Sequence, residues 1–117
     1  MRSTHLLLRD IAESRDRIAS YISGLDEAAF LGNSLVFDAV LRNLTVIGEA
    51  VKQLPAPVQQ LDPDVPWSLI ARFRDLITHA YFRVNGTEVW EIASTELPER
   101  RARIATIQSH PDIDPAR

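Results

Sequence analysis

The chain has 117 residues, of which 45% are hydrophobic and 25% are charged, and its formal net charge is −3. This length and balance predict one soluble globular domain that buries its own core. The absence of cysteine excludes disulfides and thiolate metal sites, and the negative charge argues against a protein that coats nucleic acid without specificity. A nuclease with its basic groups gathered in one groove stays compatible with that charge.

The sequence has no apolar run near the ~20 residues that a membrane-spanning helix needs. The N-terminal apolar run is only Leu6–Leu8 and is closed by Arg9, which is not the pattern of a signal peptide. We therefore expect no membrane segment and, by default, a cytoplasmic location. One domain should cover residues 1–117, with 110–117 as a loose tail.

Two long amphipathic helices are predicted in the first half of the chain. The first covers 3–23 and stops near Gly24, because its apolar residues follow one stripe with spacings of 4, 7 and 4: Leu7, Ile11, Ile18 and Ile22. A short helical turn over 26–31 follows. The second helix begins after Asn33 or Ser34 as cap, ends at Pro55, and has a stripe with spacings of 3 or 4: Val36, Val40, Leu44, Ile47, Val51 and Leu54.

Prolines divide the second half of the chain. The segment from Pro55 to Pro66 contains four prolines and predicts a loop around one short helical turn at 58–61. Pro66 suits the first position of a helix over 67–82, which ends before Asn85-Gly86. A further helix is capped by Asn85 or Thr87, Pro98 marks a kink or a restart, and a last helical segment holds Ile104 and Ile107. No segment alternates like a β-strand, so the predicted fold class is all-α: an up-and-down bundle of four to five helices.

The predicted helix over 67–82 concentrates ionisable and aromatic residues. At about 100° per residue, its apolar side chains share one arc that should face the core: Leu69, Ile70, Phe73, Leu76, Ile77 and Ala80. A second arc has the composition of an interface core: Trp67, Arg74, Thr78 and Tyr81. Asp75 and His79, four residues apart, lie beside each other further round. Arg74 and His79 are about 140° apart, so sharing one phosphate requires long reach, a distorted helix end or a second subunit.

An arginine and a histidine suffice for one metal-free reaction on RNA. The imidazole of His79 can take the proton of a ribose 2′-hydroxyl, and the guanidinium of Arg74 can hold the phosphate while charge develops on it. Asp75 could orient the His79 ring, and Thr78 could donate to the phosphate. No second ligand cluster accompanies His79, so we expect no metal and no cofactor. The plain alternative is an ordinary surface pair of Asp75 and His79, with Arg74 as the partner of some carboxylate.

The motif segment also resembles a known family. Arg74-Asp75-Leu76-Ile77-Thr78-His79-Ala80-Tyr81-Phe82 is similar to the Arg–x4–His–x–Tyr–Phe motif of HepT-like toxins, in the HEPN superfamily. Further blocks match in order: 47–50 resembles the family's Ile-Gly-Glu-Ala segment, 65–70 its Pro-Trp-x-x-Ile lead, and 89–98 the following helix with its proline. The resemblance extends from about Leu7 to Ile107.

This resemblance implies an all-α homodimer whose motif helices meet across a two-fold axis to form one cleft. It implies a metal-independent endoribonuclease that cleaves tRNA or mRNA by 2′-hydroxyl transesterification, with Arg74 and His79 as catalytic residues and Asp75 and Thr78 in support. Such proteins are the toxin of a HepT/MntA-type toxin–antitoxin system, and the antitoxin is a minimal nucleotidyltransferase. That partner adds AMP to the motif tyrosine, here Tyr81, which is also a candidate substrate contact, and the added phosphate would block the site beside Arg74.

The chain departs from the family pattern in three places, and two other interpretations stay open. Asp75 stands where asparagine is common, Arg72-Phe73 replaces a Gly-Met pair, and Asn85 stands where aspartate is common. A non-catalytic HEPN module would bind a nucleotidyltransferase partner or a nucleotide without cleaving RNA. A purely structural dimer would use Arg74 and His79 only to stabilise its seam.

Overall fold

The computed structural model describes residues 2–99 and 107, and the regular structure in this part is entirely helical. The predicted all-α fold class is confirmed. The last predicted segment, apart from a buried Ile107, and the tail 110–117 lie outside the described residues. In chain order the elements are α1 (Thr4–Ile22), α2 (Glu27–Leu31), α3 (Ser34–Gln53), α4 (Ala56–Gln59), α5 (Trp67–His79), the 3₁₀ turn η1 (Tyr81–Arg83), α6 (Gly86–Glu91), the π-helical turn η2 (Ile92–Glu96) and α7 (Leu97–Glu99).

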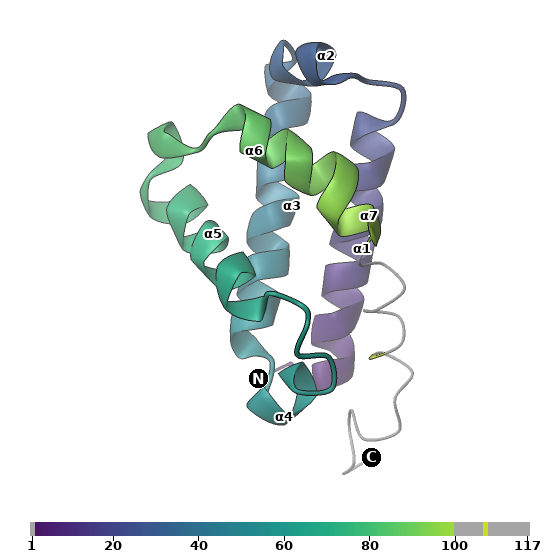
Figure 1. Cartoon of the computed structure of the whole chain (residues 1–117), viewed down its shortest axis with the longest axis vertical. Helices are drawn as coiled ribbons and strands as arrows, with labels where there is room; N and C mark the ends of the chain where they lie inside the picture. Colours follow the sequence, from purple (N-terminus) through teal and green to yellow (C-terminus); the bar gives the residue numbers. More distant parts are fainter. Residues whose placement is uncertain (1, 100–106, 108–117) are drawn as a thin grey trace.

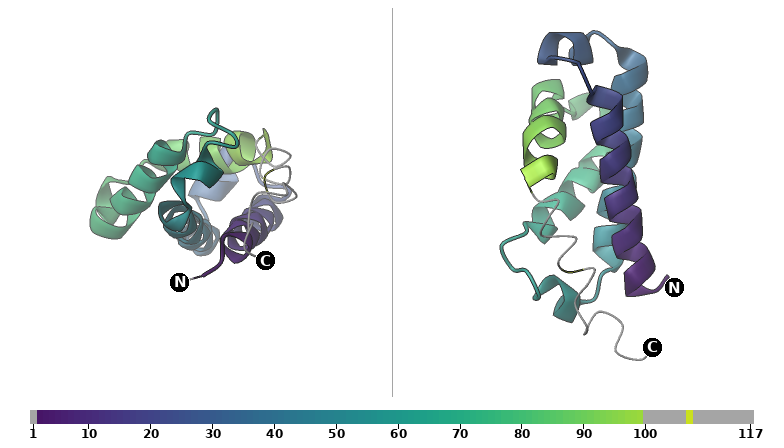
Figure 2. Two further views of the ribbon diagram at one scale, coloured as in Figure 1. Left: turned by 90° about the horizontal axis from the view of Figure 1, so that it is seen from below. Right: turned by 90° about the vertical axis from the view of Figure 1, so that its right-hand side faces the viewer.

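The two long helices form the centre of the molecule. Helices α1 and α3 run antiparallel and side by side, α5 leans against the other flank of α3, and the segment from α6 to α7 crosses the pair (Figures 1 and 2). Helix α3 therefore packs on two sides, against α1 and against α5. Within the described residues no helix is both long and apolar enough to cross a membrane.

The core follows the predicted stripes of α1 and α3. Their buried side chains meet those of the shorter elements in one cluster that includes Leu8, Ile18, Phe30, Val40, Ile47, Val51 and Val89. Burial of each large side chain contributes about 1.5–3 kcal/mol. Phe30 of α2 packs at one end of this cluster, and its ring centroid lies 5.4 Å from that of Phe37 and 5.3 Å from that of Trp90. This packing fixes α3 as the rigid element against which α5 is placed.

The predicted helix starts are largely confirmed. The side chain of Asn33 accepts from the Val36 N–H at the start of α3, and that of Asn85 accepts from the Glu88 N–H at the start of α6. Thr87 is not the cap. The first helix stops before Gly24, whose φ of 79° is the left-handed conformation that glycine adopts without strain.

Three predictions for the middle of the chain are wrong. The short turn after α3 covers Ala56–Gln59 rather than 58–61, and Pro66 is the cap residue of α5 rather than its first position. Helix α5 ends at His79, not Phe82, because Ala80 leaves the helical region with φ −143° and ψ 49°.

The expected faces of α5 also need correction at two residues. Trp67, assigned to the interface arc, is buried, and its Nε1–H donates to the carbonyls of Gln59 and Asp62, each at 3.0 Å. As the first residue of α5, its side chain points back toward the preceding loop. Leu69, assigned to the core, is 53% exposed, because α3 covers only one side of α5.

Candidate active site

Helices α3 and α5 come into close contact at Gly48 of α3. A Cβ atom at this position would lie 2.2 Å from the Cβ of Arg74 and 2.8 Å from its Cγ. No real pair of carbon atoms tolerates such distances, so the residue at 48 has to be glycine for α5 to lie where it does. The aliphatic stem of Arg74 thus packs directly on the backbone of α3, and its side chain is only 20% exposed.

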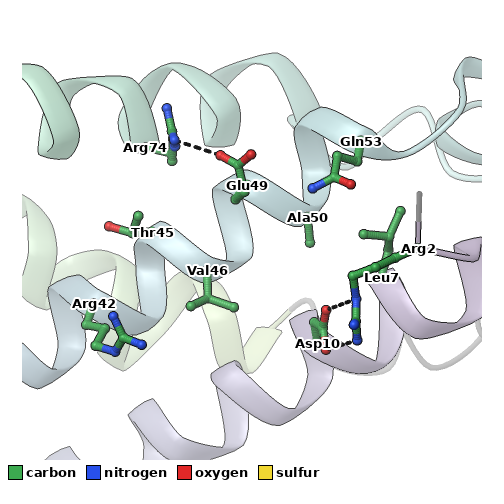
Figure 3. Close-up of a pocket in the computed structure, with 10 residues that line it drawn as sticks. All are labelled: Arg2, Leu7, Asp10, Arg42, Thr45, Val46, Glu49, Ala50, Gln53 and Arg74. Carbon is green, nitrogen blue, oxygen red and sulfur yellow. Dashed lines mark hydrogen bonds and ion pairs between the residues drawn. The ribbon is translucent and has the colours of Figure 1, made fainter.

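Two carboxylates hold the guanidinium of Arg74. Its Nη2 lies 2.7 Å from Oε2 of Glu49, and its Nη1 lies 3.0 Å from Oδ1 of Asp75 (Figure 3 shows the pair with Glu49). Its Nε is buried and has no hydrogen-bond acceptor among the residues that the structure describes. The sequence analysis missed Glu49 as a site residue, although it belongs to the Ile-Gly-Glu-Ala block that marked this part of α3.

Asp75 is placed between two cations. Its Oδ1 accepts from Lys52 Nζ at 2.9 Å and from Arg74 Nη1 at 3.0 Å. These hydrogen bonds, first from Lys52 and then from Arg74, lower the pKa of the Asp75 carboxyl below its usual value, so it remains anionic. The expected pairing of Asp75 with His79 is not found.

His79 and Thr78 are exposed at the C-terminal end of α5. The His79 side chain forms no hydrogen bond or ion pair within residues 2–99 and 107, while Arg74 faces α3. The structure therefore does not bring Arg74 and His79 onto a common contact within one chain. The imidazole is free to meet a substrate or a second molecule.

Tyr81 lies beyond α5, on η1, and so does not share a helical arc with Arg74. Its hydroxyl donates to Oδ1 of Asp38, on α3, at 2.7 Å. That hydrogen bond is the main reason why the pKa of the Tyr81 phenol is raised above its ordinary value. Tyr81 is 46% exposed and packs edge-on against Phe82, which is 98% exposed.

The described residues contain no group of three or more histidine, aspartate and glutamate side chains that could hold a metal ion. The ionic side chains at the site are instead arranged around Arg74, with Lys52, Glu49 and Asp75 as neighbours. Such an arrangement presents an anchored cation and, five residues on, an exposed imidazole. These are groups that bind a phosphate and transfer a proton.

The bundle and its motif helix are those of a class of helical ribonucleases, as a comparison with protein families shows. The model of the family described as "Ribonuclease HepT-like" matches residues 11–107, and the chain belongs to this family. A candidate RNase of Methanocaldococcus jannaschii is 38% identical over 98 residues, which cover 84% of this chain and 81% of the relative. A candidate ribonuclease HepT of Thermococcus cleftensis is 33% identical over 107 residues, which cover 92% and 97%. No solved structure matches significantly.

Proposed function

We propose that this chain is a metal-independent endoribonuclease with Arg74 and His79 as its catalytic residues. The observation that carries the proposal is the anchoring of Arg74 on Gly48 and Glu49, five residues before an exposed histidine, in a chain of the HepT-like family. An arginine preorganised by packing and ion pairs is suited to a phosphate whose charge grows in the transition state.

The proposed reaction is a transesterification within RNA. His79 takes the proton of the 2′-hydroxyl, and the 2′-oxygen forms a bond to the adjacent phosphorus. The bond from phosphorus to the 5′-oxygen breaks, and the leaving oxygen receives a proton. Arg74 stabilises the charge on the non-bridging oxygens. The products are a 2′,3′-cyclic phosphate and a 5′-hydroxyl, and DNA does not react because it lacks the attacking hydroxyl.

A second copy of the chain is proposed to complete the cleft. Helix α5 leaves Leu69, Arg72 and His79 exposed on the part of its surface that α3 does not cover. An exposed face that combines an apolar side chain with arginine is suited to a protein interface. A homodimer built on α5 brings a His79 of one copy toward the Arg74 of the other, which a single chain does not do.

The cellular role we propose is that of a toxin restrained by a nucleotidyltransferase antitoxin, in the cytoplasm, with tRNA or mRNA as the substrate. Tyr81 is the proposed site of AMP addition, and the exposure of its side chain supports this assignment. Adenylylation would remove the proton that Tyr81 shares with Asp38 and add a phosphodiester charge to η1. Thr78, exposed beside His79, is a further candidate substrate contact.

The test is incubation of the pure protein with tRNA in EDTA, followed by analysis of the product ends. We expect cyclic phosphate ends, and a loss of at least ~100-fold in rate for His79→Ala and for Arg74→Ala, the scale of one catalytic group. Arg17→Ala, an exposed change on α1 that removes the same charge as Arg74→Ala, is the matched control. Absence of cleavage by the unaltered protein would favour the non-catalytic binding module, and cleavage that survives His79→Ala would refute the assignment of His79.

A further inference from the structure

An open pocket of about 460 Å³ lies between α1 and α3, and Arg74 of α5 stands at its edge (Figure 3). We name it the α1–α3 pocket. Leu7, Val46 and Ala50 give it an apolar surface, and the Gln53 amide adds groups that donate and accept hydrogen bonds. The Thr45 hydroxyl donates to the Leu41 carbonyl and adds an acceptor. Its volume falls in the range of sites for small organic groups. Apart from Arg74, no residue of the proposed reaction lines it.

Three arginines border the α1–α3 pocket and differ in their partners. Arg2 pairs with Asp10 at 2.9 Å, and Arg74 pairs with Glu49 at 2.7 Å. Arg42 is exposed and forms no ion pair or hydrogen bond within the part of the chain that the structure describes. An unpaired guanidinium beside a pocket is available to the oxygens of a phosphate.

The position of Arg42 relative to Arg74 suits a nucleic-acid strand. Arg42 precedes Glu49 by seven residues on α3, so the two lie on nearly the same face, about 10.5 Å apart along the axis. Because Glu49 holds Arg74, the two guanidiniums are separated by a distance of this order. That spacing corresponds to roughly three stacked nucleotides at about 3.4 Å each.

We propose that the α1–α3 pocket binds a nucleotide of single-stranded RNA that flanks the cleaved bond, with Arg42 on its phosphate. The base would contact the apolar surface at Val46, and Thr45 and Gln53 would meet its polar edge or the ribose. A single strand is favoured because a base in a duplex must first lose its pairing and stacking before it can enter a pocket. The inference rests on the proposed function, since Arg74 is common to both, but it adds a separate phosphate contact.

The test measures binding and not cleavage. The unaltered chain, its Arg42→Ala variant and its Arg9→Ala variant are titrated by fluorescence anisotropy against a labelled 2′-O-methyl RNA of about 12 nucleotides, at several salt concentrations. The 2′-O-methyl groups prevent the proposed reaction. Arg9→Ala is the matched control, because it removes the same charge from an exposed arginine that pairs with Glu13 and does not line the pocket.

We expect Arg42→Ala to weaken binding on the order of tenfold and to reduce the slope of log K against log salt by about 0.7, the value of one phosphate contact on a single strand. Arg9→Ala should leave both quantities unchanged. Equal behaviour of the two variants, or no binding of the oligonucleotide by the unaltered chain, overturns the proposal. Thermal melting of each variant establishes that it is folded.

Photocrosslinking gives the location independently of any substitution. A strand of the same length with 4-thiouridine should crosslink within 42–53 of α3, and crosslinks confined to α5 and η1 would contradict the proposal. These experiments can refute the proposed nuclease activity and the proposed pocket independently of each other. An oligonucleotide that binds through Arg42 but is never cleaved in its natural form refutes the nuclease, whereas cleavage with an unchanged salt slope in Arg42→Ala refutes the pocket.

Discussion

Two aspartates take part in hydrogen bonds that shift a pKa, and the two shifts have opposite directions. Asp75 lies against Lys52 and Arg74, which lower its pKa, so a fixed negative charge shares the guanidinium with any incoming phosphate. Asp38 instead accepts from the Tyr81 hydroxyl and raises the pKa of that phenol. A phosphate bound at Arg74, as we propose, would compete with Asp75 and Glu49, whereas Tyr81 is kept protonated.

The Tyr81–Asp38 hydrogen bond predicts a titration that spectroscopy can follow. The chain has two tyrosines, so Tyr81→Phe leaves only Tyr21 to form phenolate. In the unaltered protein the Tyr81 signal should appear above pH 10, and Asp38→Asn should lower its midpoint toward 10, because the charged acceptor is lost. Absorbance of the phenolate against pH measures both.

The raised pKa of Tyr81 determines how the stability of the fold changes with pH. A phenol that holds its proton more tightly in the folded state adds stability that is complete below pH 10 and is lost as pH rises through the folded pKa. Tyr81→Phe should therefore have a weaker dependence of unfolding free energy on alkaline pH than the unaltered chain. A Tyr81 midpoint unaffected by Asp38→Asn would contradict the assigned cause.

At the residue scale the sequence indicated the chemical groups but not their partners. Arg74 and His79 were recognisable from spacing and from the chemistry that their side chains support. Lys52 is 23 residues from Asp75, and Asp38 is 43 residues from Tyr81, so neither contact leaves a local pattern in the chain. The ion pair of Glu49 with Arg74 could not be predicted for the same reason, because it depends on how α5 crosses α3.

At the scale of the element, periodicity predicted where the helices lie but not how α5 ends. The stripes of α1 and α3 follow a period of 3.6 residues, so their positions were predictable. The end of α5 is set by the backbone at Ala80, a residue that favours helices, so no local signal marked it. As a result, Tyr81 lies on the separate turn η1 and not, as predicted, on the same helical arc as Arg74.

The contact between α3 and α5 predicts an unusual response at Gly48. Replacement of a helical glycine by alanine normally stabilises a helix by about 1 kcal/mol. Gly48→Ala should instead destabilise the fold by roughly 1–3 kcal/mol, because its methyl group overlaps Arg74 and forces α5 away. Denaturant unfolding measures the change, and RNA cleavage should fall with it.

Gly24→Ala provides the control for that experiment. Its Cβ meets nothing within 4 Å, but its φ of 79° costs an alanine about 1–2 kcal/mol. The two variants should thus lose comparable stability, and only Gly48→Ala should lose activity at temperatures where both are folded. Equal activity in the two would show that the position of Arg74 does not depend on Gly48.

At the scale of the whole molecule, the separation of Arg74 from His79 makes the proposed dimer testable by complementation. Arg74→Ala and His79→Ala chains are inactive alone if both groups are required. When they are mixed by refolding, random pairing gives heterodimers with one intact site, so about a quarter of the wild-type activity should return if each site uses both copies. Mixtures no more active than their parents would place both groups in one copy.

The overall fold class was the most predictable feature, because an all-α bundle needs only helical periodicity and short loops. The geometry of the proposed dimer is a different kind of information. It depends on the exposed surface, where Leu69 and Phe82 are large apolar side chains in contact with solvent. This composition is unusual for a solvated surface, but it does not determine how two molecules would be oriented.

The packing of Arg74 on Gly48 has a consequence for genetics. If the chain is toxic, survivors of its expression will carry inactivating alleles of two kinds. Changes at His79, which is exposed and forms no hydrogen bond or ion pair in the described part of the chain, should leave the protein abundant in the cell. Changes at Gly48 or Arg74 also disturb the α3–α5 contact and should lower its abundance through proteolysis. Protein level in each survivor would therefore separate loss of chemistry from loss of fold.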